Sequence, residues 1–156
     1  MTASKTKDAQ LAIRPSAEAV VAQFVDMVAT IPDWVDDGGL AMAADIFQAK
    51  SAADLDARWR NVAEDRMVGV PVEVDHLEKA PSTIEDAALP FYLVVYGTDM
   101  RTGERIRFTT SSLAVSAQLA QAWVADWLPL PVRLTVGDKT AKGFKPKHLE
   151  ILKGEK

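Results

Sequence analysis

The sequence predicts an α+β fold that is mainly β, a five-stranded barrel of order β-β-β-α-β-β preceded by an N-terminal helical segment. Two observations predict it. Apolar residues recur at helical spacing before residue 66, whereas from residue 67 they alternate with polar residues at the period of a strand. One uncharged stretch, residues 108–125, then places a helix among the strands. The chain has 156 residues, of which 48% are hydrophobic, as expected for one ordinary domain with a core.

The first part of the chain divides into a polar lead-in, residues 1–14, expected to be disordered, and a helical extension, residues 15–65. A first helix opens at Pro15–Ser16 and ends at Pro32, because proline cannot continue the hydrogen-bond ladder. A second helix is expected over residues 40–49, and a third begins with Ser51 as its N-cap. The inward-facing residues should be Val20, Val21, Phe24, Val25, Val28, Ile31, Met42, Ile46, Phe47, Leu55, Trp59 and Val62.

The second part, residues 67–152, is expected to form the barrel domain. Its first strand carries Val68, Val70, Val72 and Val74 on one face, with Pro71 indicating an edge or a bulge. Residues 91–99 are the strongest strand, rich in aromatic and β-branched side chains, and a turn ending at Gly103 leads into the next. A helix capped by Ser111 or Ser112 follows, then strands near residues 130–136 and 148–153 joined by a basic loop.

This element order is that of the oligonucleotide/oligosaccharide-binding fold, or OB-fold, in which a helix lies between the third and fourth strands of a Greek-key barrel. A small α+β sandwich has the same element order and stays open as an alternative. In the barrel, Ile106 and Phe108 should point inward with Val132 and Leu134, and the helix should cover the barrel floor.

The composition indicates no catalytic chemistry. The chain lacks cysteine, its two histidines, His76 and His148, stand apart, and no nucleophile, phosphate-loop or metalloprotease motif is present. We therefore expect no enzyme activity, no metal and no cofactor. The N-terminus lacks the apolar core of a signal peptide, so a cytoplasmic protein with no membrane association is expected.

The charges are unevenly distributed along the chain. Residues 1–100 hold 8 basic and 17 acidic side chains, whereas residues 101–156 hold 10 and 5, which gives the overall −4. Such asymmetry is a recognised sign of a basic binding surface on an otherwise acidic protein.

The strands at residues 91–99 and 104–110 and the basic loop at 139–147 are the regions that an OB-fold uses to bind single strands. There, phosphates need basic groups and bases need flat side chains on which to stack. The tyrosines in residues 91–99 should lie beside the arginines in residues 104–110, on the face opposite the core. The candidate nucleic-acid-binding residues are Tyr92, Tyr96, Arg101, Arg105, Arg107, Lys139, Lys142, Phe144, Lys145 and Lys147.

The stretches LPFYLVVYGTDMRTGERIRFTTSSLAVSAQLAQA and LPVRLTVGDKTAKGFKPKHLEI resemble, in layout, OB-fold single-stranded DNA-binding proteins of bacteriophages and mobile elements. The resemblance covers about residues 67–152. It implies cooperative, sequence-tolerant binding to single-stranded DNA, or RNA, during replication or recombination. The helical extension could then mediate homo-oligomer formation or contact replication or recombination proteins. The rival reading is a protein-interaction, assembly or adaptor protein of a phage or mobile element whose working surface is that acidic extension.

Overall fold

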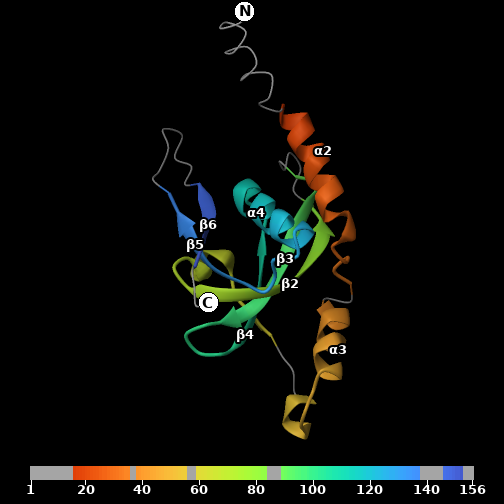
Figure 1. Ribbon diagram of the computed structural model, residues 1–156, viewed down its shortest axis with the longest axis vertical. Helices are drawn as coiled ribbons and strands as arrows, with labels where there is room; N and C mark the ends of the chain where they lie inside the picture. Colours follow the sequence, from red (N-terminus) through yellow and green to blue (C-terminus); the bar gives the residue numbers. More distant parts are fainter. Residues whose placement is uncertain (1–15, 36–37, 56–58, 84–88, 138–145, 153–156) are drawn as a thin grey trace, which may run out of the picture.

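The fold is α+β, with three α-helices and a six-stranded mixed sheet in the part of the chain that the computed structural model describes, residues 16–35, 38–55, 59–83, 89–137 and 146–152 (Figure 1). The lead-in predicted for residues 1–14 lies outside these ranges. The elements in chain order are α2 (Ala17–Met27), η1 (Val28–Thr30), α3 (Gly39–Phe47), η3 (Ala52–Leu55), β1 (Arg60–Asn61), η4 (Glu64–Met67), β2 (Pro71–Pro81), β3 (Phe91–Asp99), β4 (Arg105–Thr110), α4 (Leu113–Val124), β5 (Leu130–Val136) and β6 (Lys147–Ile151).

The sheet is open, with the strand order β1-β4-β3-β2-β5-β6. The short β1 is parallel to β4, and every other neighbouring pair is antiparallel. The predicted order of strands and helix from β2 to β6 is confirmed. Closure into a barrel would need β4 to pair with β6, and no such pairing joins the described strands.

Local sequence explains where the two longer helices begin. The Ser16 hydroxyl accepts a hydrogen bond from the Ala19 amide at 3.1 Å, and the Ser112 hydroxyl accepts one from the Val115 amide at 3.4 Å. Each side chain thereby satisfies an amide that the first helical turn leaves unpaired. Of the two predicted caps for α4, Ser112 is therefore the one used.

The turn between β3 and β4 also follows the prediction. The Gly103 amide donates to the Asp99 carbonyl at 2.7 Å, and Gly103 has φ +79°, a backbone conformation that residues other than glycine rarely adopt. The Asp99 carboxylate accepts hydrogen bonds from the Arg101 amide and guanidinium, so the turn is closed by both backbone and side chain.

The main core lies between one face of the sheet and the helices α2 and α4. Ile106 and Phe108 point into it and Arg105 and Arg107 point away, as the alternation of β4 predicts. The N-terminal helix belongs to the same core, because Phe24 is buried in it. The other buried members are Val28, Ile31, Met67, Val70, Val72, Val74, Leu77, Leu89, Leu93, Val95, Val115, Leu119, Ala120, Val132, Leu134 and Leu149.

A second, smaller apolar cluster lies on the opposite face of the sheet. Val94 and Tyr96 of β3 are buried there against Ala41 of α3, with Trp34 and Trp59 packed around them. The N-terminal segment reaches this face at the edge of β2 that β5 leaves free, where the Trp34 amide donates to the Lys79 carbonyl at 2.8 Å. Strand β3 is therefore buried on both faces.

Several local predictions were wrong. Phe47, expected to face inward, is the last residue of α3 and is 84% exposed. The third helix is only the turn η3 within the described residues, and Leu55 is exposed there. Pro71 lies at no edge, since β2 is central; it is tolerated as the first residue of its strand.

Val68 differs from the other valines of this region. It precedes β2 and is exposed, although Val70, Val72 and Val74 share the buried face as expected. The bulge of β2 lies further along the strand, between Val74 and His76.

Candidate nucleic-acid interface

Five of the predicted binding residues lie on β3, β4 and the turn that joins them. The register pairs Tyr96 with Arg107 and Thr98 with Arg105, so Tyr96 and both arginines share the face opposite the main core. Lys147 begins β6. Lys139, Lys142, Phe144 and Lys145 lie outside the described residues.

Tyr96 is fully buried on this face, although the sequence suggested a stacking surface. Its hydroxyl donates a hydrogen bond of 2.6 Å to Oε1 of Glu78, and its ring meets the Trp59 ring edge-on at 4.8 Å between centroids. Burial, and secondarily the hydrogen bond to Glu78, raises the pKa of Tyr96 well above its ordinary value of 10.0. In this conformation the Tyr96 ring offers no free face to a base.

The arginines of the face hold acidic or polar partners. Arg105 contacts Oδ2 of Asp75 at 2.6 Å and, through its other terminal nitrogen, Oδ2 of Asp45 at 3.4 Å. Arg107 donates from Nε to Asn61 at 2.6 Å. Carboxylates from β2 and α3 thus offset the positive charge of Arg105, which the sequence of β4 alone would predict to be free on the surface.

Arg101 and Lys147 are also paired. Arg101 bonds to Asp99 at 2.9 Å, and the Asp99 pKa falls below its ordinary value of 3.8, chiefly because of that side-chain hydrogen bond. Burial lowers the pKa of Lys147, but the hydrogen bond and charge of Glu64, at 3.2 Å, help to outweigh it, and the net shift is upward. Both cations are held close to carboxylates.

An open groove remains beside the buried Tyr96. It consists of two hollows of about 500 and about 360 Å³, which adjoin because both are lined by Ala63 and Thr109. Two half-buried aromatic residues, Tyr92 and Trp34, lie in different hollows, and the Arg107 guanidinium lies 5.7 Å from the Trp34 ring centroid. The remaining lining is polar or small: Asn61, Val62, Glu64, Asp65, Ser82, Thr83, Phe108, Thr110 and Ser111.

A polar cluster that the sequence did not reveal lies under α3. Glu78, only 1% exposed, accepts from Tyr96 and contacts Nε2 of His76 at 3.3 Å. Strict alternation from Val74 would place His76 and Glu78 on the core face. The bulge between Val74 and His76 reverses the alternation, so both residues join Tyr96 on the other face.

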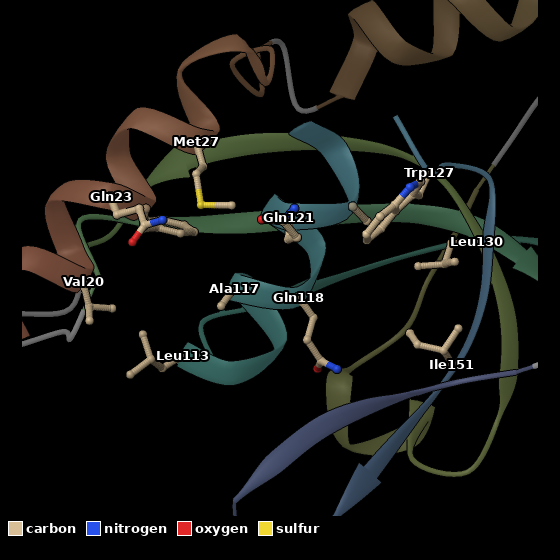
Figure 2. Close-up of a pocket in the computed structure, with 12 residues that line it drawn as sticks. Val20, Gln23, Met27, Leu113, Ala117, Gln118, Gln121, Trp127, Leu130 and Ile151 are labelled. Carbon is tan, nitrogen blue, oxygen red and sulfur yellow. The ribbon is translucent and has the colours of Figure 1, made fainter. Parts of the chain in front are cut away.

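An apolar groove of about 580 Å³ lies on the other side of the molecule, where α2, α4, β5 and the end of β6 meet. Figure 2 shows Val20 and Leu113 toward one end of this groove, Trp127, Leu130 and Ile151 toward the other, and Met27 projecting between them. Leu113, Trp127 and Ile151 are large apolar side chains with much of their surface exposed. Gln118, which also lines the groove, ties α4 to β6 by hydrogen bonds with the Leu149 backbone at 2.8 and 2.7 Å.

The described residues contain no group of three or more histidine, aspartate or glutamate side chains placed to hold a metal ion. Within the same ranges, no helix has both the length and the apolar character needed to cross a membrane. No protein-family model matches the sequence, and neither the curated proteins nor the solved structures contain a significant match.

Proposed function

We propose that the protein binds single-stranded DNA with little sequence preference, and protects or presents it during replication or recombination. The open groove is the observation that carries the proposal. It combines the aromatic ring of Tyr92 with the guanidinium of Arg107. Aromatic stacking and basic contacts to phosphates are the two components of sequence-tolerant single-strand binding.

The arrangement of strands supports this use of the groove. Strands β4-β3-β2-β5-β6, with α4 between β4 and β5 in the chain, follow the connectivity of an OB-fold, and we propose a partly open OB barrel as the finer description. In that fold the ligand crosses the second and third strands between two loops. Here Ser82 and Thr83 begin the first of those loops and line the groove, while the second joins β5 to β6 and its sequence contains Lys139, Lys142 and Lys145.

The polar lining accounts for weak sequence preference. Thr109 and Ser111 provide hydroxyl groups, which lack the paired, planar geometry that reads one base edge, and the Asn61 amide oxygen already accepts a hydrogen bond from Arg107. Phosphates would contact Arg107 and the lysines of the loop. Because Glu64 and Asp65 also line the groove, we expect moderate affinity and strong dependence on salt.

The test is fluorescence anisotropy with labelled oligo-dT, titrated at salt concentrations from about 50 to about 300 mM, with affinity expected to fall steeply. Tyr92→Leu removes the ring but keeps an apolar side chain, and should weaken binding about 5- to 100-fold, the loss of one stacked base. Phe91→Leu is the matched control, because the neighbouring ring packs toward the main core and should leave affinity unchanged. Oligo-rU in parallel compares RNA with DNA.

Two results would contradict the proposal. One is no anisotropy change at about 50 mM salt with protein well above micromolar concentration. The other is binding that Tyr92→Leu and Phe91→Leu weaken equally, which would mean that the Tyr92 ring has no specific part in it.

The alternative is a protein-interaction or adaptor protein, and the apolar groove of Figure 2 is the observation that favours it. Exposed Leu113, Trp127 and Ile151 border that groove, and it would accept the apolar face of a partner's amphipathic helix. Trp127→Ser should abolish such an association while leaving oligo-dT binding intact. Loss of oligo-dT binding in Trp127→Ser would instead place nucleic acid on this side of the molecule.

A further inference from the structure

The N-terminal segment covers part of the face proposed to bind nucleic acid. We call this element the cover and define it as Trp34, Gly38, α3 and Trp59. Its members bury Tyr96 from the side opposite the main core. Beneath the cover lies a hollow of about 230 Å³, smaller than either hollow of the open groove and lined partly by Tyr96 and Arg105.

Each contact of the cover occupies a group that a nucleic acid would use. The Asp45 carboxylate lies 3.4 Å from the Arg105 guanidinium, in the place of a phosphate oxygen. The Trp59 ring packs on Tyr96, and the Trp34 ring lies under the Arg107 guanidinium, where bases would stack. The cover therefore presents one anion and two flat rings to the face, as a short single strand would.

The cover is held more weakly than the rest of the fold. Among the α3 side chains whose burial the structure describes, Ala41 alone is buried, and Phe47 at the end of α3 points into solvent. The indole nitrogens of Trp34 and Trp59 are buried, and neither has a hydrogen-bond partner among the described residues. A buried donor without a partner favours the open, solvated arrangement. By contrast, α2 contributes Phe24 to the main core.

We infer that the cover is an autoinhibitory element that single-stranded nucleic acid displaces, which uncovers the Tyr96 ring and the Arg105 terminal nitrogen that Asp45 contacts and so extends the site beyond the open groove. This inference rests on the proposed function. It predicts that apparent affinity depends on the fraction of molecules whose cover is open, so that loosening the cover tightens binding without any new contact to the ligand.

Two substitutions loosen the cover and leave the sequence of β3 and β4 unchanged. Asp45→Asn removes one of the two carboxylates that Arg105 contacts, the one on the cover, and should tighten oligo-dT binding about two- to five-fold, the size of a partly exposed ion pair. Gly38→Val places a side chain against the Arg107 guanidinium, at a residue with φ +91°, and should tighten binding about ten-fold.

Each variant has a matched control. Asp26→Asn makes the same charge change on the exposed surface of α2, away from the face. Gly69→Val has the same unfavourable backbone, φ +83°, but its side chain meets nothing within 4 Å among the described residues. Neither control should change affinity, and circular dichroism melting establishes that each variant is folded.

Hydrogen exchange on the wild-type protein gives an independent measurement. The amides of α3 should lose protection when oligo-dT saturates the protein, because the cover leaves the face. If those amides instead gain protection, the cover belongs to the binding site and the inference is overturned. Wild-type binding that neither Asp45→Asn nor Gly38→Val tightens also overturns the inference, while leaving the proposed function intact.

Absence of oligo-dT binding by the wild type and by both folded cover variants overturns the proposed function and the inference together. Wild-type binding that Gly38→Val tightens, and Gly69→Val does not, supports both.

Discussion

Replacing Tyr96 by phenylalanine tests the buried hydrogen bond on which the covered face is built. The substitution keeps the ring, so packing against Trp59 and Ala41 is unchanged, and removes only the hydroxyl that donates to Glu78 at 2.6 Å. Glu78 is 1% exposed, so water cannot readily replace the lost donor, and His76 contacts the other carboxylate oxygen at 3.3 Å.

The expected loss is about 2 kcal/mol in the free energy of unfolding, the usual size for a buried hydrogen bond to a charged group. For a domain of this length, that corresponds to a fall in melting temperature of about 4–8 °C. Urea denaturation followed by circular dichroism measures the change. Tyr92→Phe is the control, because the described residues provide the Tyr92 hydroxyl with no hydrogen-bond partner, and it should change stability by less than about 0.5 kcal/mol.

The dependence of stability on pH above neutrality gives a second measurement of the same hydrogen bond. Because the pKa of Tyr96 is raised in the folded state, the unfolded chain loses this proton near pH 10 while the folded protein keeps it. The resulting stabilisation is complete below pH 10 and declines as the pH rises further. Tyr96→Phe lacks this titration, so its deficit relative to wild type should shrink above pH 10. Equal stabilities of Tyr96→Phe and Tyr92→Phe at neutral pH would refute the reasoning.

Two further predictions concern the turn and the helix cap. Arg101→Ala should raise the pKa of Asp99 toward its ordinary 3.8, which NMR titration of the carboxyl measures. Because that pKa is lowered in the folded protein, the pair stabilises the fold above pH 3.8, and this stabilisation is lost as the pH falls through the lowered pKa. The stability difference between Arg101→Ala and the wild type should therefore vanish at that low pH. An unchanged Asp99 titration would contradict the assigned pairing. Ser112→Ala should reduce stability by about 1 kcal/mol and Ser111→Ala by much less, and equal losses in urea denaturation would mean that the cap is wrongly assigned.

The sequence was a good guide wherever local chemistry decides the structure. Alternation along β4 placed Ile106 in the core and Arg107 outside it, and Gly103 and Ser112 marked a turn and a helix cap that the structure contains. These features depend on neighbours within a few residues, so periodicity and turn chemistry are sufficient to predict them.

The covered face was not predictable in the same way. The contact between Asp45 and Arg105 joins residues 60 positions apart, and nothing in the periodicity of either segment indicates it. The bulge in β2 moved Glu78 to an unexpected face. Tyr96 therefore read as an exposed ring beside two arginines, when it is the centre of a buried polar cluster.

The burial of β3 on both faces has a consequence for how its register is fixed during folding. In a sheet with one solvent-exposed face, shifting a strand's register by one residue is unfavourable because it moves every buried apolar side chain of that strand into water. Leu93 and Val95 on one side of β3 and Val94 and Tyr96 on the other are all fully buried, so hydrophobicity alone distinguishes the slipped pairing poorly.

Two specific contacts specify the pairing instead. Glu78 finds its buried donor only where Tyr96 lies beside it. Gly97 lies so close to β2 that a side chain there would approach the Glu73 carbonyl oxygen at 2.5 Å, and a slipped strand would bring Tyr96 or Thr98 into that position. The buried Glu78 and Gly97 thus fix the register between β2 and β3 during folding, a role separate from any part they have in binding.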